Sequence, residues 1–141
     1  GLVGGGGCGV VGGGGGWGDR PDVADPRIRE LGYVPDAEIA RLLRGAAVYC
    51  YPSLFEGFGM PIVEAMACGT PVVASSHPSL DEACGDAAVR VDPHDPAAIA
   101  TGIRSALERR EELVPRGLAH AAGFDWERTG SLMLAALAER R

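Results

Sequence analysis

The sequence predicts an α/β domain in which a Rossmann-like parallel sheet is flanked by helices. Three observations support this fold class. Short, continuous apolar runs at residues 48–52 and 72–74 are typical of strands buried on both faces. Segments with helical apolar spacing alternate with these runs along the chain. Residues 51–75 also follow the order strand, glycine-bearing loop, helix, strand, which is a crossover unit of a parallel sheet.

Length and composition agree with this fold class and exclude several functions. The 141 residues fit a single domain, 1–141, with its own hydrophobic core. The formal net charge of −6 argues against a nucleic-acid partner, which would need a basic surface. No apolar segment has the length of a transmembrane span and no signal peptide is visible. The four cysteines lack zinc-ligand spacing, which favours reduced thiols and a cytoplasmic location.

Residues 1–26 are rich in glycine and form a poorly defined start, with a short strand expected around Val10 and Val11. The glycines at 4, 6 and 9, and again at 13, 15 and 18, match the spacing of a dinucleotide-binding fingerprint. A nicotinamide-dependent oxidoreductase is the function that this spacing would imply. The fingerprint must open a helix, but residues 19–22 (DRPD) show no apolar helical period, and a run of glycines matches the spacing by arithmetic. A flexible run is therefore the favoured interpretation.

The regular part of the chain begins with a strand predicted at residues 31–34 (LGYV). A helix should follow over residues 37–44, with Asp36 as its N-terminal cap. The apolar residues of this helix recur on one face: Ile39, Leu42, Leu43 and Ala46.

Residues 51–75 (YPSLFEGFGMPIVEAMACGTPVVAS) contain the candidate site. Pro61 suits the first position of a helix over residues 61–68, and Gly69 is expected to end it. The loop before this helix offers free backbone N–H groups, which suit an anion such as a diphosphate. These groups belong to Gly57, Phe58, Gly59 and Met60.

Two carboxylates, Glu56 in the loop and Glu64 in the first helical turn, flank this anion position. They do not suit phosphate because like charges repel, so we expect them to accept hydrogen bonds from adjacent sugar hydroxyls. A sugar on each side of a diphosphate describes a nucleotide sugar. In the alternative interpretation, Glu64 is a helix carboxylate favoured by the helix dipole and Glu56 is a solvated loop residue.

The segment EGFGMPIVEAMACGTPVVAS closely resembles the donor-binding half of retaining glycosyltransferases of the two-Rossmann-domain (GT-B) type, specifically family 4, glycosyl transferases group 1. The resemblance extends over residues 31–137. It implies the C-terminal half of a GT-B fold, N-terminally truncated, which transfers a sugar from a nucleoside-diphosphate sugar to an acceptor with retention of the anomeric configuration. The acceptor, a glycan, lipid or small molecule, would be bound by the missing N-terminal domain.

The resemblance also implies a role for each site residue. Glu56, as the catalytic residue, would hold the donor-sugar hydroxyls, residues 57–60 would meet the sugar and diphosphate through their backbone, and Glu64 would take the ribose hydroxyls. The nucleobase would lie near Tyr33, although Tyr33 as a simple strand aromatic is an equal alternative. No metal or other cofactor is expected, and no DxD-like pair stands beside the loop. The Lys that such enzymes use to neutralise the departing diphosphate is absent, because all thirteen basic residues are Arg.

The remaining elements complete the predicted domain. Residues 75–88 should form a loop with one helical turn, and residues 89–91 a strand. Helices are expected at residues 96–109, capped by Asp95, and at 111–122. Asp125 should cap a last helix over 126–140, within a terminal segment 124–141 that reaches the other domain in the resembling family, so part of its apolar surface should be exposed. A non-catalytic nucleotide-sugar-binding module, or an inactive fragment, is the alternative function.

Overall fold

A computed structural model describes residues 2–3, 9–12 and 25–138 of the chain. In this part, six strands form one sheet in the order β3-β2-β1-β4-β5-β6. The strands are β1 (Leu2–Val3), β2 (Gly9–Gly12), β3 (Ile28–Gly32), β4 (Val48–Tyr51), β5 (Val72–Ser75) and β6 (Ala88–Val91). The pairs β2·β3, β4·β5 and β5·β6 are parallel, whereas β1 is antiparallel to both β2 and β4. The predicted parallel sheet is confirmed, with one antiparallel strand that the sequence did not reveal.

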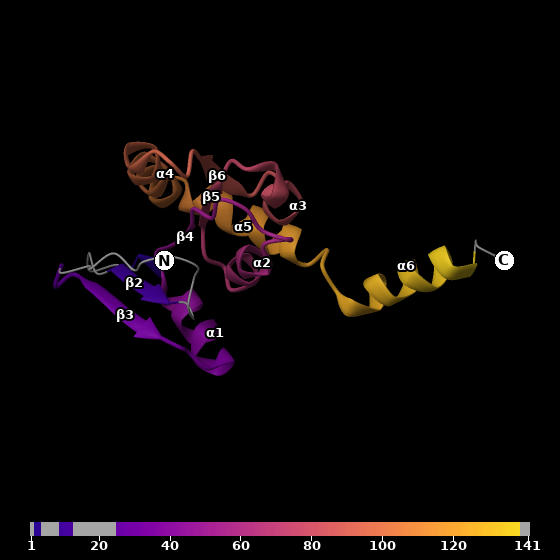
Figure 1. The fold of residues 1–141 in the computed structure, drawn as a ribbon. Helices are drawn as coiled ribbons and strands as arrows, with labels where there is room; N and C mark the ends of the chain where they lie inside the picture. The colour runs from indigo at the N-terminus through magenta and orange to yellow at the C-terminus, as the bar shows by residue number, and fades with distance from the viewer. Residues whose placement is uncertain (1, 4–8, 13–24, 139–141) are drawn as a thin grey trace.

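Helices cover both faces of the sheet (Figure 1). The helices of the described chain are α1 (Asp36–Gly45), α2 (Met60–Ala67), α3 (Asp81–Cys84) after the 3-10 turn η1 (Pro78–Leu80), α4 (Pro96–Glu108), α5 (Arg110–Ala121) and α6 (Trp126–Ala138), of which α6 lies away from the sheet. All four residues of β5 are buried because their side chains alternate between two cores. Val72 and Ala74 pack with residues of α2 on one face, and Val73 packs with residues of α4 on the other.

The helix ends are set by residues that the sequence singled out. After α2, Gly69 adopts a left-handed backbone, its N–H donates to Met66 O at 2.9 Å, and Thr70 N–H donates to Ala65 O at 3.0 Å. The Asp95 carboxylate caps α4 by accepting from Ala97 N–H at 2.8 Å. The Asp125 carboxylate accepts from Arg128 N–H at 2.6 Å. The predicted roles of Gly69, Asp95 and Asp125 are confirmed.

Three boundary predictions were wrong. The first strand of the regular part, β3, ends at Gly32, where a left-handed backbone with φ +62° stops it before Tyr33 and Val34. Asp36 does not cap α1, because Pro35 occupies the cap position and its carbonyl accepts from the N–H groups of Glu38 and Ile39. The helix α2 begins at Met60, one residue earlier than predicted, and Glu64 therefore lies beyond its first turn.

The terminal helix α6 projects away from the body of the domain (Figure 1). Its large apolar side chains are exposed, with Trp126 at 88% and with Leu132, Met133, Leu134 and Leu137 all above 60%. The expected exposure of apolar surface on this helix is confirmed. Its predicted end at residue 140 and both glycine fingerprints include residues outside the described ranges, whereas the strand expected around Val10 is present as β2.

Candidate functional site

The predicted site lies where β4 and β5 end. Residues 52–59 connect β4 to α2, and residues 76–77 connect β5 to η1. Since β4 and β5 are parallel, both connections begin at the same edge of the sheet. A hydrogen bond of 3.3 Å from Glu56 N–H to Ser79 Oγ joins the connection after β4 to η1. This edge is where open α/β sheets bind ligands.

Gly59 shapes the entry into α2. It is the N-cap residue and has a left-handed backbone with φ +96°. Within the described ranges, the backbone N–H groups of Gly57, Phe58, Gly59 and Met60 donate to no protein acceptor. Because helix N-termini carry partial positive charge, these open donors can bind an anion.

Glu56 is held by two side-chain hydroxyls. Its Oε1 atom accepts a hydrogen bond of 2.6 Å from Tyr51 Oη and one of 2.7 Å from Ser53 Oγ. The bond from Tyr51, and then that from Ser53, lowers the pKa of the Glu56 carboxyl, while burial opposes the shift. Glu56 is therefore ionised at neutral pH and can serve as a hydrogen-bond acceptor.

A pair of tyrosines lies close to both predicted carboxylates. Tyr49 and Tyr51 share one face of β4, and their rings stack with centroids 5.9 Å apart. Burial, followed by the charge of Glu64 and more weakly those of Cys50 and Glu56, raises the pKa of Tyr49 to about 12. Burial, followed by the hydrogen bond to Glu56, raises the pKa of Tyr51. The exposed Glu64 and the half-buried Glu56 thus both act electrostatically on Tyr49.

Tyr33 stands apart from this group. It follows β3 and is 84% exposed. The strands β3, β2, β4 and β5 all run in the same direction, so Tyr33 lies at the same edge of the sheet as Glu56. However, β2 and β1 separate β3 from β4, and the two residues lie at different positions along this edge.

Arg90, which the sequence analysis did not single out, fixes the segment after β5. Its Nε donates to Ser75 O at 2.7 Å, and its Nη2 donates to His77 O at 2.9 Å and to Asp81 Oδ1 at 3.0 Å. A charged residue in the otherwise apolar run AVRV was the available signal. Tyr51, Ser53 and Ser79 were also missed, because their partners become visible only when the segments meet.

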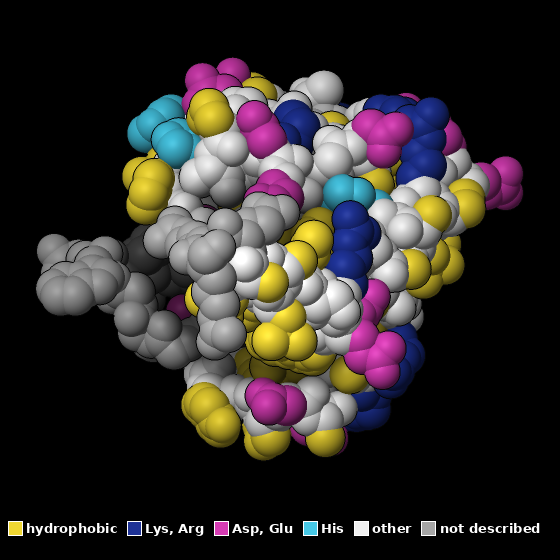
Figure 2. Space-filling view, turned by 90° about the vertical axis from the view of Figure 1, so that its right-hand side faces the viewer, with side chains coloured by type: hydrophobic (Ala, Val, Ile, Leu, Met, Phe, Trp, Pro, Cys, Tyr) yellow, Lys and Arg dark blue, Asp and Glu magenta, His cyan; other side chains and the backbone are white. Residues whose placement is uncertain are grey.

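A hollow of about 560 Å³ adjoins the loop. It is lined by Phe58 of the loop and Met60 at the start of α2, and by residues around the start of α6, including Phe124 and Trp126. The rings of Phe58 and Phe124 meet edge to face, 5.6 Å apart. Figure 2 looks at the molecule from the side on which α6 projects, and hydrophobic side chains gather across its centre. This hollow is apolar at Phe58 and Met60, whereas Glu82, Asp125 and Arg128 add charged groups to its lining.

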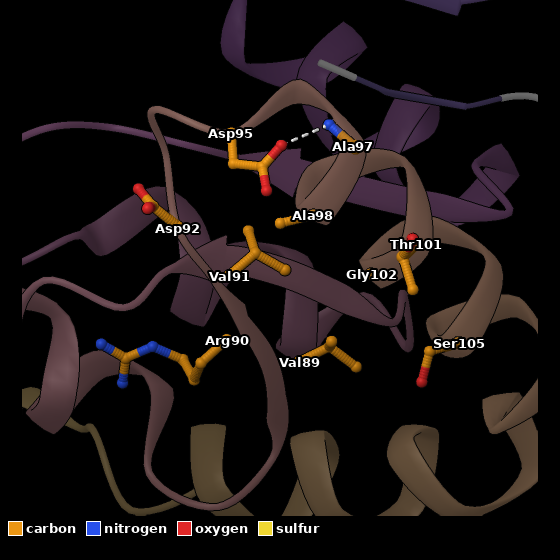
Figure 3. A pocket seen from close by; sticks show the side chains of 10 residues that line it. All are labelled: Val89, Arg90, Val91, Asp92, Asp95, Ala97, Ala98, Thr101, Gly102 and Ser105. Carbon is orange, nitrogen blue, oxygen red and sulfur yellow. Dashed lines mark hydrogen bonds between the residues drawn. The ribbon is translucent and has the colours of Figure 1, made fainter.

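A second hollow, of about 570 Å³, lies over β6 and α4 (Figure 3). Its polar groups serve the fold: Asp95 caps α4, and Asp92 accepts from His94 N–H at 2.9 Å. Figure 3 shows that Arg90 extends away from Thr101 and Ser105 on the opposite wall. The polar groups do not converge on one point, so this hollow is not the candidate site.

In the part of the chain that the structure describes, no group of three or more His, Cys, Asp or Glu could hold a metal ion. A site without metal stays a prediction. No helix among these residues combines the length and apolar character needed to cross a bilayer.

The sequence matches the profile of the family Glycosyl transferases group 1 over residues 25–116. The O-antigen chain mannosyltransferase B of Escherichia coli is 50% identical over 103 residues, covering 71% of this chain and 27% of that protein. The D-inositol 3-phosphate glycosyltransferase of Geodermatophilus obscurus is 44% identical over 100 residues, covering 70% of this chain and 22% of that protein. The chain thus spans about a quarter of the length of these relatives.

Two solved structures share the fold. Anabaena HepE in complex with UDP-glucose has a TM-score of 0.71 at 25% identity, covering 82% of this chain and 33% of that one. Sucrose-phosphate synthase from Thermosynechococcus elongatus has a TM-score of 0.66 at 29% identity, covering 80% and 31%. Both neighbours are GT-B glycosyltransferases. Together with the match over residues 25–116, these similarities establish that the chain belongs to the glycosyl transferases group 1 family.

Proposed function

We propose that this chain is the donor-binding, C-terminal half of a retaining GT-B glycosyltransferase of family 4. In this proposal it binds a nucleoside-diphosphate sugar whose glycosyl group is transferred with retention of the anomeric configuration. The observation that carries the proposal is the group of open amides at residues 57–60, with the carboxylates of Glu56 and Glu64 nearby. Such a group offers donors to a diphosphate and acceptors to sugar hydroxyls.

Each proposed role follows from the chemistry of the residue. The amides of Gly57, Phe58, Gly59 and Met60 suit the diphosphate because they donate to no acceptor among the residues that the structure describes, and because they lie at the positive end of α2. Glu56 suits the donor-sugar hydroxyls because its lowered pKa keeps it ionised, so it accepts hydrogen bonds and does not donate a proton. Glu64 is exposed and suits the ribose hydroxyls. Tyr33 is proposed to lie near the base, where an exposed aromatic ring can stack.

Transfer breaks the bond between the anomeric carbon and a diphosphate oxygen and forms a bond from that carbon to the acceptor oxygen. The negative charge that develops on the leaving diphosphate must be stabilised, and each preorganised donor is worth about 3–4 kcal/mol in such a site. The loop amides supply part of this stabilisation without a metal. The bound UDP-glucose of the HepE neighbour supports a nucleotide-sugar ligand for this fold.

The remaining features of the whole reaction are proposals as well. We propose that the acceptor, a glycan, lipid or small molecule, binds to a part of the protein outside these 141 residues, as the coverage of the relatives suggests. Cys68 and Cys84 are free thiols, and burial raises the pKa of Cys84. We propose a cytoplasmic location, which suits reduced thiols.

A second candidate is a nucleotide-sugar-binding module without catalytic activity, or an inactive fragment. The observation that favours it is the lack of Lys in the sequence, combined with the engagement of Arg90 by Ser75, His77 and Asp81. A chain of this kind would bind the donor but would not stabilise the departing diphosphate fully.

Calorimetric titration of the chain with UDP-, GDP- and ADP-sugars tests the donor site. We expect one nucleotide class to bind and the variant Glu64→Ala to lose that binding. Glu108→Ala, which removes an exposed glutamate near the end of α4, is the matched control and should bind as the wild type does. A folded wild-type chain that binds none of these sugars would contradict the proposal.

A further inference from the structure

The two oxygens of Glu56 have different surroundings. Oε1 receives the hydroxyls of both Tyr51 and Ser53, at 2.6 and 2.7 Å. The Ser53 hydroxyl has one proton, and its other candidate acceptor, Phe55 O, is farther away at 3.3 Å. Within the described residues, Oε2 receives no hydrogen bond. One oxygen is thus satisfied internally and the other is left for a ligand.

The backbone of Glu56 is held as well. Its N–H donates to Ser79 Oγ at 3.3 Å, and Ser79 Oγ in turn lies 2.9 Å from His77 Nδ1. Ser79 N–H also donates to His77 Nδ1, at 3.1 Å, so this nitrogen acts as an acceptor. Arg90 holds the same segment through the carbonyl oxygens of Ser75 and His77. The connections after β4 and β5 therefore fix Glu56 together.

We infer that Tyr51 and Ser53 are positioning residues which bind Oε1 of Glu56 and so present Oε2 to a hydroxyl of the donor sugar. The inference rests on the proposed function, because it needs Glu56 to bind the sugar part of the donor. Tyr51 is well suited to the task since its ring is fixed by stacking on Tyr49 at the end of a buried strand. The neutral phenol hydroxyl of Tyr51 restricts the orientation of the Glu56 carboxylate without adding a charge to the site. Hydrogen bonds to the ionised form also keep Glu56 in that form.

The test uses the 141-residue chain with substitutions that remove one hydroxyl each, Tyr51→Phe and Ser53→Ala. Tyr49→Phe is the matched control, because it removes a neighbouring phenol hydroxyl that does not bond to Glu56. Calorimetry would compare the nucleoside-diphosphate sugar of the preferred class with the same nucleoside diphosphate lacking the sugar. We expect Tyr51→Phe and Ser53→Ala each to weaken binding of the nucleotide sugar about tenfold, the usual effect of losing a hydrogen bond to a charged group. Binding of the nucleoside diphosphate should be unchanged.

A second readout follows the Glu56 carboxyl itself. Carbon-detected NMR titration of the chain without ligand should show a higher Glu56 pKa in Tyr51→Phe and in Ser53→Ala than in the wild type or Tyr49→Phe. The other titratable groups around this carboxyl, Tyr49, Tyr51, His77 and Glu64, are to be followed in the same titration. If a substitution instead caused a general loss of structure, the calorimetry would show equally weaker binding of the nucleotide sugar and of the nucleoside diphosphate.

The outcomes separate the inference from the proposed function. If the wild type binds nucleotide sugar and neither hydroxyl deletion changes that binding, the inference is wrong and the proposed function stands. If Tyr51→Phe and Ser53→Ala weaken the binding of nucleoside diphosphate and of nucleotide sugar to the same extent, Tyr51 and Ser53 have a structural role and the inference is wrong. If the wild type binds neither ligand, the proposed function fails and the inference fails with it.

Discussion

Gly59 and Leu80 are in such close contact that a Cβ atom on Gly59 would lie 2.7 Å from Cδ2 of the leucine. Gly59 also has a left-handed backbone, which L-residues with a side chain rarely adopt. Leu80 is fully buried and has little room to move. The loop before α2 can therefore pack this closely against the turn after β5 only because residue 59 has no side chain.

We expect Gly59→Ala to lower the free energy of unfolding by about 2–4 kcal/mol, as the sum of overpacking and backbone strain. Denaturant unfolding of the purified chain measures this loss. Gly57→Ala is the control for stability, because a Cβ there meets nothing within 4 Å. Equal stability of the two variants would show that the contact with Leu80 is relaxed easily.

Arg90→Met should lower the free energy of unfolding by about 2–3 kcal/mol, because two carbonyl oxygens and Asp81 lose a charged donor. Arg90→Lys should recover only part of the loss, since an ammonium cannot reproduce the fork of the guanidinium. Hydrogen exchange at residues 76–81 would locate the effect. An unchanged exchange rate there would contradict the role given to Arg90.

Two helical glycines should respond in opposite directions to alanine. A Cβ on Gly102 of α4 would lie 2.5 Å from Val91 Cγ1, so Gly102→Ala should destabilise the domain by about 1–3 kcal/mol. A Cβ on Gly130 of α6 would meet nothing within 4 Å. Gly130→Ala should therefore stabilise the helical state of α6 by roughly 0.5–1 kcal/mol, the difference between Gly and Ala within a helix, and so raise its helix content. Thermal unfolding measures the first effect and far-ultraviolet circular dichroism the second.

The apolar surface of α6 should contribute little to the stability of the domain. Leu134→Glu should leave the midpoint of thermal unfolding unchanged, because this side chain is 71% exposed. Leu113→Ala should lower the free energy of unfolding by about 2–5 kcal/mol, because Leu113 is buried. If the isolated chain self-associates through α6, sedimentation should show less association in Leu134→Glu.

The hydrogen bonds to Glu56 predict a pH-dependent stability. Because the pKa of Glu56 is lowered in the folded state, its contribution is present above the unfolded-state pKa and is lost as the pH falls through the folded-state pKa. Tyr51→Phe should therefore be less stable than the wild type at pH 7, and the difference should shrink as the solution is acidified. Unfolding titrations across the acidic range check this, and a difference that grows at low pH would contradict it.

Local rules predicted the unit from β4 to β5 because its signals lie within the segment itself. Pro61 and Gly69 mark the ends of α2 to within one residue, and Asp95 marks the start of α4. The end of β3 was misplaced because an apolar run continues past Gly32, whose backbone conformation ends the strand. The group around Glu56 was only partly foreseen. The hydrogen bond between Glu56 and Ser79 joins residues that are 23 apart in sequence, and such a contact depends on how the strands are arranged in the sheet.

The antiparallel strand β1 lies between two parts of the sheet, the pair β2–β3 and the triplet β4–β6. This strand has two residues, and within the described ranges its ladders are the backbone pairing between the β2–β3 pair and the β4–β6 triplet. Few bonds must open there to separate the two parts, whereas β4, β5 and β6 share longer ladders and the buried cores. The domain therefore has a seam, and the triplet forms the more cooperative folding unit. The loop with Glu56 and the turn with Ser79 both adjoin the triplet, so the hydrogen-bonded group around Glu56 lies on one side of this seam.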